Sequence, residues 1–533
     1  MKRSWLLACL LCASAAAQVK YEDIIKSPGE DWLTYAGSYS GWRYSPLEEI
    51  TAENVGSLAS KWVYRVPNSR KLQTSPLVYQ GVMYVTDANS VYALDGAAGR
   101  LIWQYVDTRV EEQSNNRGAA ILGNRVYITT SDNYLTALDR RTGALLFSKN
   151  FADVAKNTKS TAAPFVAGDK VIVGSSGGDS GMRGFIAGLS AETGEEIWKT
   201  YTVPEKDGDP GSETWGRMLG WGGGAAWLSG TFDPELNLLY WTTGNPWPDF
   251  NPDTRPGDNL YTCSLVALDL DTGEMRWHFQ FTPHDTHDWD AQSWPVLVDI
   301  DWRGSKSKVV LHANRNGFFY MLDRVTGEFL RATQLIDNVT WSSGIDDSGR
   351  PVLIDDKDPT TEGNWVCPSV KGATNWMGQT YNPGTGLLYV ITLEQCGLYS
   401  KSLQVPVPMK NFPGGGATEK GGQVIVRALD PKTGKRVWEY PMTGVGLMWS
   451  GLVSTSGGVV FAGDDDGSFI ALDARTGKHL WHFSLGEQLN ASPIVYEAGD
   501  KQYVAIASST AIFSFGLFEP MKPVPLPKIT IQE

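Results

Sequence analysis

Three aspartates lie close together in the segment TPHDTHDWDAQ of this 533-residue chain. They are Asp285, Asp288 and Asp290. The usual explanation for such a run is a solvated acidic loop. In an extended segment, however, Asp288 and Asp290 would point to the same side and could together bind a hard cation through oxygen. His284 and His287 would by themselves suit zinc. The segment therefore predicts a cation site and leaves the ion open.

Other segments carry residue types that could bind a ligand, and each also has an ordinary structural explanation. Asp179 follows a Gly-rich run in VIVGSSGGDSGMRG, where backbone N–H groups can approach a ligand closely, although such a run could equally form a bulge. Asn245 precedes a proline in YWTTGNPWPDF, and an Asn-Pro pair most often forms a turn. Arg117 and Arg315 could make surface ion pairs, and Trp227 could be one more core tryptophan. Only an architecture that brings these residues together would favour a site.

A repeated pattern provides that architecture. A short apolar strand is followed by Ala-Leu-Asp-x-x-Thr-Gly or a close variant, and then by a second strand that usually contains Trp. The Asp can cap a tight turn in which Gly takes a positive φ. The Trp would then pack between neighbouring sheets, which accounts for much of the content of 21 tryptophans. Seven copies occur, at residues 91–103, 135–147, 186–198, 265–277, 319–330, 426–438 and 469–481.

An eighth Trp-containing strand, at residues 61–66, has no preceding copy. The C-terminal run 503–515 would supply its missing partner, and such pairing closes a ring without leaving strand edges. The sequence thus predicts an all-β fold, an eight-bladed β-propeller closed between N- and C-terminal strands. Its longest insertions, 200–262 and 332–420, are where a site would be built. A propeller without chemistry remains the alternative at this point.

The N-terminal residues 1–17 have the features of a secretory signal peptide, with Lys2 and Arg3 before an apolar run that ends in small residues. The propeller is expected over 18–520, followed by a short tail at 521–533. No later segment is apolar enough to span a membrane. We therefore expect a soluble, periplasmic protein. The net charge of −13, without a basic block, argues against a nucleic-acid partner.

Three cysteines follow the predicted signal peptide. In an oxidising compartment two of them could form a disulfide and one would be left over. Cys367 and Cys396 are the closer pair, so we predict a bridge between them. Cys263 lies in an apolar, strand-like run and is expected to be a buried thiol. The chain has no C-x-x-C-H motif, so it carries no covalent c-type haem.

The repeats, together with the opening segment WLTYAGSYSGWRYSPLEEI at 32–50, resemble the quinoprotein alcohol dehydrogenases. These are the methanol and ethanol dehydrogenases that use pyrroloquinoline quinone (PQQ). The resemblance covers nearly all of the mature chain and includes the predicted disulfide between Cys367 and Cys396. The repeats alone are a weak functional signal, because a non-catalytic outer-membrane assembly lipoprotein has similar ones. The specific signal lies in the loops.

The resemblance assigns roles to the acidic loops. Asp288 falls on the catalytic base of the D-x-D motif and is also a metal ligand. Asp290 falls on the extra carboxylate of the lanthanide-using branch, and Asn245 on a metal ligand. Asp179 stands where the family usually has Glu, so its reach is shorter by about 1.5 Å. The motif does not use His284 or His287 as ligands, and we interpret both as structural.

The resemblance also implies quinone contacts. Arg117 would pair with a cofactor carboxylate, Arg315 would face the quinone oxygens, and Trp227 would stack on the ring system. The full set of implied contacts is Gln73, Arg117, Thr161, Ser176, Gly177, Gly178, Trp227, Arg315, Asn375 and Trp449. Two features depart from the family. Residues 111–118 read EEQSNNRG, so the frequent disulfide between adjacent cysteines is missing, and Gln73 stands where many members have Glu.

These residues imply a PQQ- and metal-dependent alcohol dehydrogenase that uses Ca²⁺ or a lanthanide ion. With no haem in the chain, the electron acceptor would be a separate soluble cytochrome c. One alternative is a binding or scaffold propeller that has lost catalysis. Another is a quinoprotein that acts on an aldehyde, sugar or polymer, which would share every site residue. The sequence leaves the alcohol and the oligomeric state open, and a homodimer is compatible with it.

Overall fold

The computed structural model describes residues 18–518 except 27, 110–114, 217–218, 405–406, 409, 411, 445 and 447–448. The predicted signal peptide 1–17 and the tail 521–533 lie outside the described residues. Strands dominate the described part of the chain, whose one α-helix is α1 (Tyr21–Lys26). No helix in that part is long and apolar enough to cross a membrane. The prediction of an all-β fold is confirmed.

Five four-stranded sheets are each formed by strands that follow one another in the chain. The first contains β3 (Leu77–Tyr79), β4 (Val82–Asp87), β5 (Ser90–Asp95) and β6 (Leu101–Val106), and the second contains β7 (Ala120–Leu122), β8 (Arg125–Thr129), β9 (Tyr134–Asp139) and β10 (Leu145–Asn150). The third contains β11 (Phe165–Ala167), β12 (Lys170–Gly174), β13 (Phe185–Ser190) and β14 (Glu196–Tyr201). The fourth contains β15 (Thr231–Asp233), β16 (Leu238–Thr242), β17 (Ser264–Asp269) and β18 (Met275–Gln280), and the fifth contains β19 (Val296–Trp302), β20 (Ser305–Ala313), β21 (Phe318–Asp323) and β22 (Phe329–Gln334).

Two further four-stranded sheets and one five-stranded sheet contain strands that do not all follow one another in the chain. One contains β26 (Thr380–Asn382), β27 (Leu387–Glu394), β30 (Gln423–Leu429) and β31 (Arg436–Pro441). In the next, β1 (Tyr44–Ser45) joins β32 (Leu452–Thr455), β33 (Val459–Gly463), β34 (Ser468–Asp473) and β35 (His479–Ser484). In the last, β2 (Leu58–Arg65) joins β38 (Ala511–Leu517), β37 (Gln502–Ala507) and β36 (Ile494–Glu497). The long insertion adds β23 (Ser342–Ile345) with β24 (Pro351–Leu353), and β25 (Asn364–Val366) with β28 (Gly397–Lys401) and β29 (Gly415–Glu419).

The repeated turns dock one sheet on the next, as the sequence predicts. In the β5–β6 turn, the Oδ1 atom of Asp95 accepts two backbone N–H groups of its own turn. In the β9–β10 turn, Gly143 has φ +72°, and a Cβ atom there would lie 2.5 Å from the Trp103 ring. Trp103, on β6 of the preceding sheet, donates its indole N–H to the Arg140 carbonyl at 3.0 Å. Equivalent bonds to the neighbouring sheet are made by Trp62, Trp198 and Trp438.

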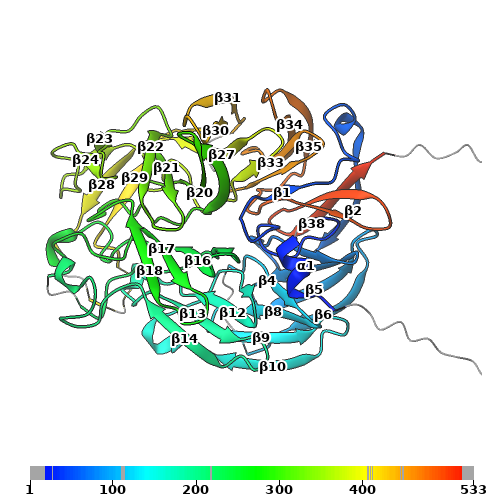
Figure 1. The fold of residues 1–533 in the computed structure, drawn as a ribbon, viewed down its shortest axis with the longest axis horizontal. Coiled ribbons are helices and arrows are strands. Elements are labelled where there is room, and N and C mark those ends of the chain that lie inside the picture. The colour runs from blue at the N-terminus through cyan, green and yellow to red at the C-terminus, as the bar shows by residue number, and fades with distance from the viewer. Residues whose placement is uncertain are drawn as a thin grey trace, which may run out of the picture.

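The sheets surround a common centre, and the N-terminal and C-terminal strands lie side by side (Figure 1). β2 pairs antiparallel with β38, from Leu58 opposite Leu517 to Arg65 opposite Ala511. Arg43 ties further distant segments together from a fully buried position. Its guanidinium donates to the Tyr35, Leu452 and Pro493 carbonyls and to the Ser75 hydroxyl. Buried hydrogen bonds to a charged donor are individually strong, so this residue has a structural role.

The predicted disulfide between Cys367 and Cys396 is present, and Cys263 is a buried free thiol. The bridge connects the end of β25 to the start of β28, where Val366 lies opposite Gly397. The segment that follows Cys367 contacts the predicted site, because Ser369 and Val370 accept side-chain hydrogen bonds there. The disulfide therefore fixes a wall of that site.

We expect the Cys367→Ala/Cys396→Ala variant to be less stable by about 3–4 kcal/mol, since the bridge closes a loop between residues 29 apart. The measurement is the midpoint of thermal unfolding for the oxidised protein. Cys263→Ala is the matched control, because it removes a buried thiol that forms no bridge. A double variant that unfolds at the wild-type temperature would contradict the prediction.

Candidate active site

The predicted acidic and amide ligands come from turns that follow strands of two consecutive sheets. Asp179 follows β12, Asn245 follows β16, and Asp288 and Asp290 follow β18. Backbone hydrogen bonds connect these turns. Gly224 donates to the Asn245 carbonyl, Gly223 donates to the Met182 carbonyl near Asp179, and Ala291 donates to the Thr243 carbonyl. The propeller sheets thus bring residues more than a hundred positions apart to one region.

Asp290 is the centre of a buried network. Its Oδ1 atom accepts the backbone N–H of Asn245 at 2.6 Å. Its Oδ2 atom accepts from the Arg315 guanidinium at 2.7 Å and from the Trp227 indole at 3.2 Å. Asp290 and Arg315 are only 6% exposed, so this ion pair is shielded from solvent. The structure therefore joins four of the predicted residues in direct contact.

Asp288 lies beside this network in an uncommon backbone conformation. Its φ is +60°, and its side chain is about one quarter exposed. The Arg315 guanidinium lies 3.8 Å from its Oδ2 atom. Burial raises the pKa of Asp288 well above the usual range, the charges of Asp290 and Asp179 raise it further, and Arg315 opposes them. A non-glycine residue at positive φ costs energy and is often found at functional positions.

The sequence prediction that this segment is extended is wrong. Asp285 accepts the backbone N–H groups of His287 and Trp289, which closes a turn and places Asp288 in the left-handed region. His287 lies against the Trp289 ring and shares a hydrogen bond with the Lys357 carbonyl. His284 contacts the Gly257 carbonyl in the same way. Both histidines thus have backbone partners, in agreement with the structural role expected for them.

Asp179 occupies the short 3-10 helix η3 (Gly178–Ser180) rather than a strand end or bulge. Asp179 is exposed on one side. Protein atoms surround its carboxylate on the other sides, and this partial desolvation raises its pKa. Within the described residues, no three Asp, Glu, His or Cys side chains are close enough to hold one ion. Asp179, Asp288 and Asp290 would therefore have to move together to share a cation.

Arg117 is the predicted cofactor contact with the most distinctive surroundings. Its guanidinium lies between two indole rings, 4.9 Å from the centre of Trp227 and 4.8 Å from that of Trp376. It donates to the Thr161 carbonyl at 3.2 Å, while its buried Nε atom has no partner in the described structure. Burial lowers the pKa of Arg117 to about 10, so the group is still a cation at neutral pH. Trp376, which the sequence interpretation missed, follows Asn375 directly.

Several other polar atoms of this region are also buried without a partner among the described residues. They are Gln73 Oε1, Ser160 Oγ, Asp249 Oδ1 and Arg315 Nε. Buried polar atoms are normally hydrogen-bonded. A polar ligand bound beside Arg117 or Arg315 could satisfy their unpartnered Nε atoms.

The remaining predicted contacts make local interactions of their own. Gly177 has φ +105°, and a Cβ atom there would lie 2.4 Å from the Asn157 carbonyl. Asn375 donates to the Lys371 carbonyl and accepts the Trp376 N–H. Ser176 pairs with Lys159 through the backbone. In the described structure, Gln73, Gly178 and Trp449 make no hydrogen bond to the Asp290 network.

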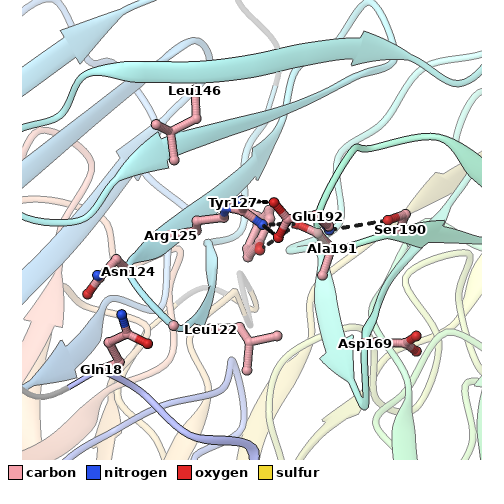
Figure 2. Close-up of a pocket in the computed structure, with 11 residues that line it drawn as sticks. Gln18, Leu122, Asn124, Arg125, Tyr127, Leu146, Asp169, Ser190, Ala191 and Glu192 are labelled. Carbon is pink, nitrogen blue, oxygen red and sulfur yellow. Dashed lines mark hydrogen bonds and ion pairs between the residues drawn. The ribbon is translucent and has the colours of Figure 1, made fainter.

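A separate cavity of about 560 Å³ lies next to β8 and β13 (Figure 2). Arg125 and Glu192 line it and form a two-point ion pair, with N···O distances of 2.5 and 2.6 Å. None of the predicted site residues lines this cavity. Because none of them lines it, this cavity is not the candidate active site.

Comparison with known proteins identifies the family. The profile of the PQQ β-propeller domain of glucose, ethanol and alcohol dehydrogenases matches residues 32–334. The chain belongs to the PQQ-dependent alcohol dehydrogenases. A second profile, of the outer-membrane protein assembly factor BamB, matches residues 422–511.

Relatives cover nearly the whole chain of this quinoprotein. The quinoprotein alcohol dehydrogenase PedH of Pseudomonas putida is 36% identical, over 94% of this chain and 90% of the relative. The lanthanide-dependent methanol dehydrogenase of Methylacidiphilum fumariolicum is 33% identical, over 95% and 90%. A solved europium-containing methanol dehydrogenase superimposes with a TM-score of 0.87 at 31% identity, over 93% of this chain and all of that one. The quinoprotein is thus an alcohol oxidoreductase with the β-propeller fold of its family.

The residues present fit PQQ and a cation, judged by their chemistry. Among the residues that the structure describes, Arg117 is a buried cation without a carboxylate partner, which suits an anionic group. The Trp227 and Trp376 rings, which hold this guanidinium between them, offer flat apolar surfaces. The acidic turns offer oxygen donors and an excess of negative charge, which suit a hard cation.

Proposed function

We propose that this quinoprotein oxidises an alcohol to the aldehyde in the periplasm, using PQQ and a metal ion, and passes the electrons to a soluble cytochrome c. The observation that carries the proposal is the contact of Asp288 and Asp290 with one buried guanidinium, that of Arg315. The contact supports a proposal in which Asp288 is the base, Arg315 a positioning cation and Asp290 a metal ligand of one site. We also propose that the eight larger sheets are the blades of a ring closed by β2 and β38.

In this proposal each side chain has a defined task. Asp288 accepts the proton of the alcohol hydroxyl group, and Arg315 favours its ionised form from 3.8 Å away. Arg117 binds a carboxylate of the cofactor, and Trp227 provides a flat wall. Asp179, Asn245, Asp288 and Asp290 supply oxygen ligands to the ion. When bound, PQQ would supply the hydride acceptor and the ion would supply Lewis acidity.

Reconstitution tests the cofactor and the ion together. Purified mature protein is incubated with PQQ plus Ca²⁺ or PQQ plus La³⁺, and dye reduction is followed with a panel of primary alcohols. We expect activity to require both PQQ and an ion, and to be higher with La³⁺, because Asp290 adds a negative charge that favours a trivalent cation. Removal of the ion with a chelator should abolish turnover.

The alternatives give different results in the same assay. Activity with Ca²⁺ alone would retain the enzyme and make Asp290 incidental to the choice of ion. Tight PQQ binding without activity on any alcohol would indicate an aldehyde, sugar or polymer as substrate. No PQQ binding with either ion would contradict the proposal and favour a scaffold propeller.

A further inference from the structure

Asp249 is a buried carboxylate that the proposed mechanism does not use. It lies in the turn after β16, four residues beyond Asn245, and is 3% exposed. Its Oδ1 atom is inaccessible to solvent and has no hydrogen-bond partner in the described structure. Burying a carboxylate without a partner is costly. An unpaired carboxylate at this depth is therefore evidence for a ligand.

The turn that carries Asp249 packs against the turn that carries Asp179. A Cβ atom at Gly181 would lie 2.8 Å from the Trp247 ring, so this ring rests directly on the Asp179 turn. Gly223 lies between the two turns and forms backbone bridges with Pro246 on one side and Arg183 on the other. Asp249 and Asp179 therefore lie on turns that contact each other.

The same turn is attached to the segment that carries Asp288 and Asp290. The Nη2 atom of Arg255 donates to the Asp249 carbonyl at 3.2 Å and to the Asp285 carbonyl at 2.6 Å. The Nε atom of the same side chain donates to the Pro248 carbonyl at 3.0 Å. These bonds use the backbone of Asp249 and leave its side chain available.

The electrostatics agree with this placement. Burial raises the pKa of Asp249 well above the usual range. The charges of Asp179, Asp288 and Asp290 raise it further, and Arg255 opposes them. The same carboxylates that are proposed to bind the ion therefore act on Asp249. A cation among them would relieve the repulsion.

We infer that Asp249 is an additional carboxylate of the cation site, and that its charge favours a trivalent over a divalent ion. It supplies the charge and the oxygen that the short side chain of Asp179 leaves out of reach. The inference rests on the proposed function, because it assumes that an ion binds between Asp179 and Asp290. The ligand class is a hard cation with oxygen coordination.

Calorimetric titration tests this role without measuring activity. TbCl₃ or CaCl₂ is titrated into protein mixed with one equivalent of PQQ, and titration into PQQ alone is subtracted. Asp249→Asn should weaken Tb³⁺ binding by about 10–100-fold and Ca²⁺ binding by a smaller factor. The matched control is Asp253→Asn, which alters an exposed carboxylate of the same turn that pairs with Lys401. The control should bind both ions like the wild type.

The outcomes separate this inference from the proposed function. If the wild type binds neither ion, the metal assignment fails and the inference fails with it. If the wild type binds and Asp249→Asn binds Tb³⁺ equally well, only the role of Asp249 is overturned. Equal losses for both ions would indicate a structural role and would also overturn it. Asp249→Ser, which keeps a neutral oxygen, replaces the Asn variant if that variant does not fold.

Discussion

Replacing Asp288 by Asn should lower kcat for alcohol oxidation by about 10²–10⁴-fold, because the amide cannot accept the hydroxyl proton. The variant should fold normally. Asn has nearly the same shape as Asp and tolerates the left-handed backbone that Asp288 adopts at φ +60°. PQQ binding should persist, since Arg117 and Trp227 are unchanged. The measurements are steady-state dye reduction and the absorption spectrum of bound PQQ.

Asp346→Asn is the matched control for this experiment. Asp346 lies in the exposed β23–β24 turn and accepts local hydrogen bonds from Ser348 and Arg350. The control should keep wild-type turnover. An Asp288→Asn variant that also turns over at the wild-type rate would remove Asp288 from the role of base. A variant that loses PQQ as well as turnover would indicate a ligand role instead.

Replacing Arg117 by Met should lower the affinity for PQQ by about 100-fold or more, because a charge-assisted contact to a carboxylate is lost. The apo protein should be as stable as the wild type or more stable. Two cation–π contacts contribute about 1–4 kcal/mol in total. Desolvation of a buried cation that lacks a carboxylate partner costs several kcal/mol. Equilibrium binding of PQQ and denaturant unfolding of the apo protein measure the two effects separately.

Arg43→Met is the comparison variant, because Arg43 has a structural role. It should lose stability, whereas Arg117→Met should lose PQQ affinity. Arg43 is equally buried, but its guanidinium donates to four acceptors in distant segments. Its removal leaves these acceptors unsatisfied and should lower the free energy of unfolding by about 3–5 kcal/mol. Wild-type PQQ affinity in the Arg117→Met variant would exclude Arg117 from the site. A marked loss of apo stability in that variant would show that Arg117 is structural, like Arg43.

The sheets could be predicted from the sequence because their signals are local. The Asp of a repeat caps its own turn, as Asp95 does, and Ser190 does so in the third copy. The Gly follows within four residues. The docking of Trp103 on the Arg140 carbonyl recurs at the same position of other copies. A repeated interaction of this kind is visible in one chain without an alignment.

The site could be predicted only in part, because its contacts join distant segments. Resemblance to a family pointed to Asp290 and Arg315, but not to the ion pair between them. The turn at Asp288 was missed because two backbone N–H groups bond to the Asp285 side chain, which overrides the expected extended pattern. Asp249 was missed because its burial depends on Arg255 and on neighbouring turns. An acidic residue within an aromatic and proline-rich segment, NPWPDF, is the one local signal that could have indicated it.

The pairing of β2 with β38 also determines the order in which the sheets can form during synthesis. The two strands are separated by more than four hundred residues. At about 5–20 residues per second, β38 emerges roughly 20–90 s after β2. During that interval β2 exposes an unpaired edge, which is a template for aggregation. The other sheets can form as their strands appear, so the sheet that joins both ends is completed last. A cell that makes this protein must therefore shield β2 until synthesis is nearly finished.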